Sequence, residues 1–121
     1  MKVSDLAKSQ MRDIGSYYKI NFGLKVMQNV IASVKNTFET LRLQPFMGSI
    51  EPLLDEYPQS FRSLVQHHNL KIVYWLEDET VKIALIFDTR QRPEKLPYIV
   101  KNKSSWVCEE PVEYRKPSEL L

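Results

Sequence analysis

The side chains best suited to chemistry gather in residues 61–96, a stretch that favours β-strands and ends on a basic cluster. Arg90 and Arg92 stand in this cluster. A guanidinium group can hold a phosphate or a carboxylate, although cations at a strand end also serve simply to keep a sheet edge soluble. His67 and His68 are candidate acid–base groups, because histidine titrates near neutral pH. Both fall in an expected turn, so exposed turn residues are their favoured interpretation.

Metal and cofactor chemistry finds little support in the sequence. Two adjacent histidines without a companion cysteine or a spaced histidine cannot make a closed zinc site. Cys108 is the only cysteine, which excludes an internal disulfide and a paired-cysteine metal site. We therefore expect neither a metal nor a cofactor.

Composition bounds the class of protein. The chain has 121 residues, of which 43% are hydrophobic and 26% charged, and this fits one globular domain with a modest core. The net charge is +2, and residues 1–44 hold seven Lys/Arg against three Asp/Glu, which permits a polyanionic partner without requiring one. No run approaches the roughly 18 apolar residues of a membrane span, and no signal-peptide core follows the first residues. We expect a cytoplasmic protein with no membrane partner.

Two amphipathic helices are predicted in the first third of the chain. From Ser4, a suitable N-cap, to about Asn21, apolar residues recur at three- and four-residue steps. Gly23 can take the positive φ at which a helix ends. A second apolar stripe occupies residues 24–43, and Pro45 prevents its continuation. Because the link is so short, the two helices should form an antiparallel hairpin.

The second half of the chain is predicted to form a small sheet. Residues 44–59 contain three prolines and a glycine without a sustained period, so we expect a crossover loop. Three strands follow at residues 61–66, 70–76 and 81–87, and their short links predict an antiparallel meander. The predicted fold class is therefore α+β, with an N-terminal antiparallel helix hairpin packed on a small antiparallel β-sheet.

Alternation in the third strand predicts which residues face the helices. One face of the sheet is expected to cover the helices, and the second to be mixed and available. The two predicted sets in the third strand are Val81, Ile83, Leu85 and Phe87 on one face and Lys82, Ala84, Ile86 and Asp88 on the other.

A short helical turn is expected over residues 94–100. The predicted domains are a folded unit over residues 1–100 and a tail over residues 101–121 that is loosely ordered or covers the sheet. Trp106 is too apolar to leave in water cheaply, so we expect residues 105–108 to pack on the sheet.

This order of elements resembles the RelE/ParE superfamily of type II toxin–antitoxin toxins, over roughly residues 3–96. The long hairpin and the IFDTR ending favour the ParE branch. Members usually begin with a longer strand before the position of Ser4, so we expect an under-filled sheet edge that can recruit another strand. The resemblance rests on Ser4-x-x-Ala7, Ile14-x-x-Tyr17, Phe22-Gly23, Leu41 to Pro45 with Gly48, Phe61-Arg62-x-Leu64, Ile72-Val73-Tyr74 and Ile86 to Gln91.

The resemblance implies a small bacterial toxin of the plasmid-stabilisation type, which inhibits growth and forms a hetero-oligomer with a cognate antitoxin. ParE-type toxins act on DNA gyrase without a known nuclease site, so a ParE-like chain would have no catalytic activity. Trp75 is costly to expose, which predicts either burial under the tail or contact with a partner. The target-binding set expected on this interpretation is Arg62, Lys71, Trp75, Arg90 and Arg92.

The alternative is a RelE-like endoribonuclease that cleaves mRNA on the ribosome. Attack of a 2′-OH on phosphate needs a base, an acid and cations for the developing charge. Arg62, Lys71 and Arg90 would hold the phosphate, and His67 or Tyr98 would move protons. A second alternative is an inactive member that binds antitoxin and co-represses an operon. The RelE-like catalytic set is incomplete, and its interruptions are Leu64, Gln91 and Pro97.

Overall fold

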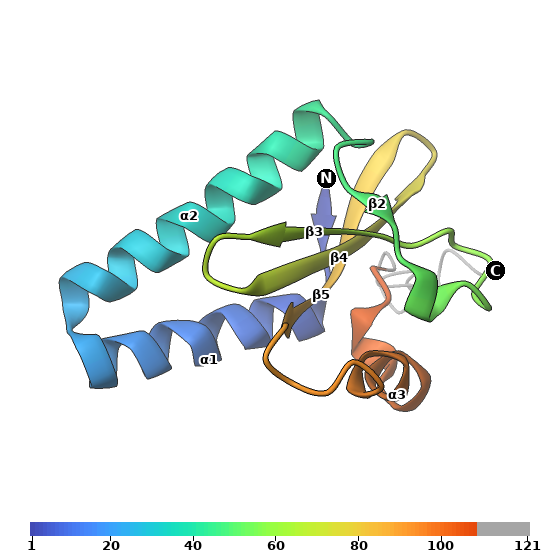
Figure 1. Cartoon of the computed structure of the whole chain (residues 1–121). Helices are drawn as coiled ribbons and strands as arrows, with labels where there is room; N and C mark the ends of the chain where they lie inside the picture. The colour runs from blue at the N-terminus through green and yellow to red at the C-terminus, as the bar shows by residue number, and fades with distance from the viewer. Residues whose placement is uncertain (109–121) are drawn as a thin grey trace, which may run out of the picture.

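The computed structural model describes residues 1–108 and shows an α+β fold, in which a hairpin of two long helices packs on a five-stranded sheet (Figure 1). The strand order is β1-β5-β4-β3-β2. Among the described residues, no helix combines the length and the apolar character needed to cross a membrane. In chain order, the elements are β1 (Lys2–Val3), α1 (Asp5–Phe22), α2 (Leu24–Leu43), β2 (Ser49–Ile50), the 3-10 turn η1 (Pro52–Leu54), β3 (Arg62–Gln66), β4 (Leu70–Glu77), β5 (Thr80–Asp88), α3 (Lys95–Asn102) and the 3-10 turn η2 (Ser104–Trp106).

The helix hairpin forms as the sequence predicts. The hydroxyl of Ser4 caps α1 by accepting a hydrogen bond from the Ala7 amide at 2.9 Å. Gly23 separates the helices at φ 93°, and its amide donates to the Lys19 carbonyl at 3.1 Å. The face of α2 that packs toward the sheet is buried, and it consists of Val30, Val34, Phe38 and Leu41.

The predicted meander is confirmed, because β3, β4 and β5 pair antiparallel in sequence order. Two short edge strands that the sequence pattern did not predict extend the sheet to five strands. Strand β2 pairs antiparallel with β3, and β1 pairs parallel with β5 beside Lys82 and Ile83. Strands of two residues carry no periodicity, so the sequence pattern could not reveal them.

A bulge in β5 changes which residues face the helices. Tyr74 pairs with Ile83 while Val73 pairs with Leu85, so Ala84 is an extra residue in β5. The predicted alternation is therefore wrong after Ile83. The face toward the helix hairpin carries Val81, Ile83 and Ile86, and the other face carries Ala84, Leu85 and Phe87.

Side chains of the first helical turns satisfy the backbone of this bulge. The Ser4 hydroxyl donates to the Ala84 carbonyl at 2.5 Å, and the Gln10 side-chain oxygen accepts from the Ile86 amide at 2.7 Å. A bulge leaves backbone groups without ladder partners, so these two bonds offset its cost. They also fix the position of α1 against β5.

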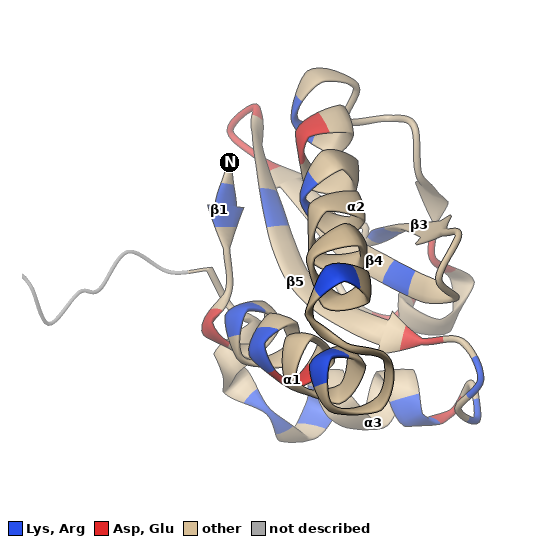
Figure 2. Ribbon diagram, turned by 90° about the vertical axis from the view of Figure 1, so that its left-hand side faces the viewer, with Lys and Arg blue, Asp and Glu red and all other residues tan. Residues whose placement is uncertain are grey.

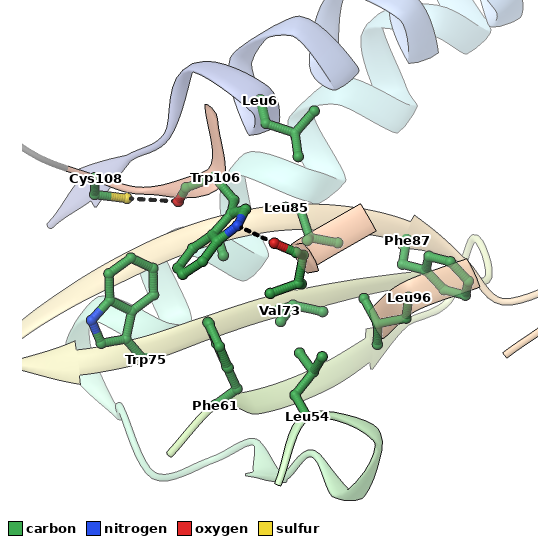
Figure 3. Close-up of a cluster of buried hydrophobic side chains, with 12 residues drawn as sticks. Leu6, Leu54, Phe61, Val73, Trp75, Leu85, Phe87, Leu96, Trp106 and Cys108 are labelled. Atoms are coloured by element: carbon green, nitrogen blue, oxygen red, sulfur yellow. Dashed lines mark hydrogen bonds between the residues drawn. The ribbon is translucent and has the colours of Figure 1, made fainter. Parts of the chain in front are cut away.

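The second face of the sheet is covered, which corrects the expectation of a mixed and available face. The rings of Phe61, Trp75 and Trp106 meet edge to face, with centroids separated by 5.6, 5.4 and 5.7 Å (Figure 3). The Trp106 indole donates to the Val100 carbonyl at 2.8 Å. Leu96 of α3 is fully buried in the same cluster. One sheet thus separates two apolar clusters.

The structure tests the predicted tail only as far as residue 108. Residues 105–108 pack on the sheet as expected, because Trp106 and Cys108 are both buried. Residues 109–121 lie outside the described residues. The predicted domain boundary at residue 100 stays a prediction.

Candidate partner-binding surface

Arg90 lies just after β5, where Asp88 holds it in a fixed orientation. Two guanidinium nitrogens donate to the two carboxylate oxygens of Asp88 at 3.0 and 2.7 Å, and the Arg90 amide donates to the same carboxylate at 2.9 Å. These bonds lower the pKa of Asp88 and raise the pKa of Arg90. Tyr18 and Tyr17 on α1 raise the pKa of Arg90 further by a smaller amount. The Arg90 side chain is 62% exposed. It is therefore an ordered and accessible cation beside the helix hairpin.

The turn between β3 and β4 lies between the two helices and joins them to the end of β5 (Figure 1). The amide and hydroxyl of Thr89 both donate to the Asn69 carbonyl, at 2.8 and 3.0 Å. The His67 ring lies 3.5 Å from the Ser33 hydroxyl on α2, and its centroid lies 4.0 Å from that of His68. The turn is thus held both to Thr89, the residue before Arg90, and to α2.

Aromatic rings continue from this turn to the tip of the helix hairpin. The Tyr18 centroid lies 6.3 Å from His68, 5.2 Å from Tyr17 and 5.7 Å from Phe22. Burial, and then the charge of His67, lowers the pKa of His68. Burial beside Tyr18 and the charge of His67 thus both favour the uncharged form of the His68 imidazole.

The outer side of the hairpin tip is apolar and exposed. Ile20 is 82% exposed and Phe22 is 57% exposed, although both are large hydrophobic residues. Residues 14–38 contain three lysines and no acidic residue. An exposed apolar surface rimmed by charge is typical of a protein interaction site. We define the hairpin-tip surface as Tyr17, Ile20, Phe22, Leu24 and Val26.

Arg62 holds the crossover loop on the hairpin side of the sheet. One guanidinium nitrogen donates to the Gly48 carbonyl at 2.6 Å, and the guanidinium carbon lies 4.9 Å from the centre of the Phe46 ring. Tyr74 stands opposite Arg62 in the ladder, where its hydroxyl donates to the Pro45 carbonyl at 2.6 Å and accepts from the Gly48 amide at 3.0 Å. Arg62 thus has a positioning role in this loop.

Lys71 lies on the opposite face of the sheet, because it pairs in register with Phe87 of the second apolar cluster. It donates to the Glu51 carboxylate at 2.7 Å, and this carboxylate is only 2% exposed. Glu51 also accepts from the Ser63 hydroxyl at 3.0 Å and from the Leu53 amide at 3.1 Å. Burial alone would raise the pKa of Glu51, but these donors and the charge of Lys71 outweigh it, so the pKa is lowered. The positive charge of Lys71 is therefore already neutralised.

The other predicted site residues differ in their accessibility. Trp75 is 5% exposed and packs against Trp106, so the structure places it under the C-terminal segment. Tyr98 on α3 is 67% exposed, and Arg92 is exposed in the loop before α3. Trp75 could contact a partner only if this segment moved.

The predicted site residues therefore do not form one constellation. Arg90 and His67 lie at the same end of the sheet, whereas Arg62 and Lys71 point to opposite faces and are engaged elsewhere. RNA cleavage by attack of a 2′-OH on phosphate needs cations that converge on that phosphate. In this arrangement, Arg62 and Lys71 cannot hold the same phosphate.

The sequence analysis missed the hairpin-tip surface and the role of Glu51. Ile20 falls off the apolar stripe of α1, and this off-stripe position beside Phe22 was the signal that could have revealed the hairpin-tip surface. Glu51 carried no local signal, because its partner Lys71 stands 20 residues away.

Comparison with known proteins places this geometry in a family. The family model described as "ParE toxin of type II toxin-antitoxin system, parDE" matches residues 1–93. A solved structure from P. aeruginosa, described as a chromosomal ParDE TA system, has a similar fold, with a TM-score of 0.61 and 16% sequence identity. The alignment covers 72% of this chain and 91% of that chain. A search of curated proteins gives no match. The family match spans most of the sequence, and the chain belongs to the ParE toxin family of type II toxin–antitoxin systems.

Proposed function

We propose that this chain is a cytoplasmic growth-inhibiting toxin that works by binding DNA gyrase and is neutralised by a cognate antitoxin in a hetero-oligomer. The observation that favours binding over RNA cleavage is that Arg62 and Lys71 lie on opposite faces of the sheet. Both cations are engaged, with Gly48 and Glu51 respectively, so they are not arranged for phosphoryl transfer.

The binding surface that we propose combines Arg90 with the hairpin-tip surface. Arginine and aromatic side chains are enriched among the residues that dominate the energy of protein interfaces. Arg90 is pre-oriented by Asp88, so little side-chain entropy is lost when it contacts a partner. The exposed Ile20 and Phe22 supply apolar area that a partner would remove from water.

Growth under induced expression tests the role of Arg90. Arg90→Ala should relieve growth inhibition by at least about tenfold in viable counts, since an interface arginine is worth about 1.4 kcal/mol or more. Arg42→Ala is the matched control, because Arg42 is also exposed and paired with a carboxylate, that of Glu39. Equal toxicity of Arg90→Ala and the wild type, at equal thermal stability, would remove Arg90 from the site.

A second pair of variants tests the hairpin-tip surface. Ile20→Lys should weaken binding of purified antitoxin or gyrase by about tenfold or more without lowering the melting temperature, because Ile20 is 82% exposed. Leu43→Lys changes a residue that is 65% exposed at the far end of α2 and should bind as the wild type does. Equal affinity of Ile20→Lys and Leu43→Lys for both partners would argue against this surface.

The nuclease remains the second candidate, favoured by one observation: His67 and Arg90 lie at the same end of the sheet, linked through Asn69 and Thr89. The two targets give different outcomes. Inhibition of supercoiling by purified gyrase with intact cellular mRNA supports the proposal, whereas rapid mRNA loss in translating extracts supports the nuclease. Normal growth without antitoxin would instead favour the inactive co-repressor.

A further inference from the structure

The segment that closes the second face of the sheet carries an excess of cations. Residues 89–108 contain five Lys/Arg and one acidic residue, Glu94. In Figure 2, Lys and Arg positions mark both ends of α3. This segment continues beyond residue 93, where the family match ends. We define the basic extension surface as its four exposed cations, Arg92, Lys95, Lys101 and Lys103.

These four cations differ from Lys71, Lys82 and Arg90, each of which is paired with a carboxylate. Lys71 is paired with Glu51, Lys82 with Glu77 at 2.8 Å, and Arg90 with Asp88. The basic extension surface has no carboxylate partner within residues 1–108. Within the described residues, no carboxylate neutralises the positive charge of this surface.

The side chains around these cations indicate the class of partner. Leu96 and Val100 of α3 are buried in the core, and Tyr98 is the exposed aromatic residue of this helix. Protein interfaces are depleted of lysine and enriched in aromatic residues. A lysine-rich surface with little exposed apolar area fits a phosphate backbone instead.

The same features favour duplex DNA over a single strand. Single-stranded nucleic acids are held by series of aromatic rings that stack on successive bases, whereas α3 exposes one ring, that of Tyr98. An eight-residue helix rises about 12 Å. Duplex DNA carries one charge per about 1.7 Å of its axis, so cations at both ends of α3 can reach several phosphates.

We propose that the outer face of α3 binds the phosphate backbone of double-stranded DNA, without sequence preference, through the basic extension surface. The basic extension surface includes neither Arg90 nor the residues of the hairpin-tip surface. The proposal is independent of whether gyrase is the target.

Fluorescence anisotropy with the purified full chain and a labelled random-sequence duplex tests the proposal. Three or four phosphate contacts predict a slope of about −3 for the logarithm of affinity against the logarithm of salt concentration. The variant Lys95→Glu/Lys101→Glu/Lys103→Glu should lose at least about tenfold in affinity and most of this slope. The variant Lys95→Gln/Lys101→Gln/Lys103→Gln should lose both as well, and it introduces no negative charge at the C-terminal end of α3.

The matched control is Lys19→Glu/Lys25→Glu/Lys35→Glu, which changes the net charge equally but lies on the helix hairpin. This control should retain most of the affinity. Equal loss in the two charge-reversed variants would mean that only net charge matters and would overturn the assignment to α3. Undetectable binding by the wild type at low salt, or tighter binding to single-stranded RNA of equal length, would overturn it as well.

Discussion

At the scale of single residues, Glu51 ties the crossover to the sheet. Its carboxylate accepts from the Lys71 ammonium, the Ser63 hydroxyl and the Leu53 amide, and its own amide donates to the Phe61 carbonyl at 2.8 Å. A buried carboxylate is tolerated only when such donors replace water. The Glu51 side chain therefore determines where β2 and η1 lie.

The first prediction concerns the stability that Glu51 provides. Glu51→Gln should lower the free energy of unfolding by about 2 kcal/mol, because Lys71 loses its partner and the site loses an ionic acceptor. Glu77→Gln removes the carboxylate of the more exposed pair with Lys82 and should lower stability clearly less than Glu51→Gln does. Urea denaturation measures both values. Equal losses would show that burial adds nothing to the Glu51 pair.

The second prediction is the pH dependence of the same pair. Folding lowers the pKa of Glu51 from its ordinary value of 4.5, so the unfolded chain binds a proton more readily than the folded protein. The contribution of Glu51 is therefore fully present above about pH 5 and is lost as pH falls through the folded pKa. The stability difference between the wild type and Glu51→Gln should shrink below about pH 4. A difference that grows on acidification would contradict this sign.

At the scale of elements, periodicity predicts the two long helices and the three central strands, because each repeats its pattern over several residues. It cannot predict the bulge at Ala84. The extra residue is tolerated because Ser4 and Gln10, about 80 residues earlier, satisfy the backbone around it. Such compensation is invisible in the local sequence.

In the candidate site as well, contacts between residues close in sequence could be predicted and contacts between distant residues could not. The pairing that orients Arg90 is local, since Asp88 stands two residues earlier, and sequence analysis singled out this arginine. The partners of Arg62 and Lys71 stand 14 and 20 residues away. Strand alternation across the regular β3–β4 ladder could separate the faces of the sheet, but it could not reveal which acceptors engage these two cations.

The third prediction tests the packing of the crossover loop. A Cβ atom on Gly48 would lie 2.6 Å from the Tyr74 hydroxyl and 2.8 Å from the Ser63 carbonyl, so Gly48→Ala should cost about 2 kcal/mol. Gly15 in α1 is the control, because its added Cβ would meet only Ile31 and Met27 side chains at 3.7 Å or more. Gly15→Ala should raise stability by about 0.5–1 kcal/mol. Melting temperatures that shift in the same direction would contradict this contrast.

At the scale of the whole molecule, the sheet carries an apolar cluster on each face, and the C-terminal segment completes the second one. Phe61 and Trp75 are buried partly because Trp106 covers them. Residues 94–108 therefore contribute to the core of this protein. This arrangement leaves the helix hairpin and the outer face of α3 as separate exposed surfaces.

The last prediction follows from this shared core. Trp106→Ala should lower the free energy of unfolding by about 3–5 kcal/mol, because it removes a large buried side chain and the hydrogen bond to Val100. Tyr98→Ala changes an aromatic residue of the same segment that is 67% exposed, so its effect should stay within about 0.5 kcal/mol. Because Trp106 packs on the sheet itself, helix content and tryptophan fluorescence should report one common transition in the wild type. Loss of the fluorescence signal well before the helical signal would show that the C-terminal segment unfolds separately.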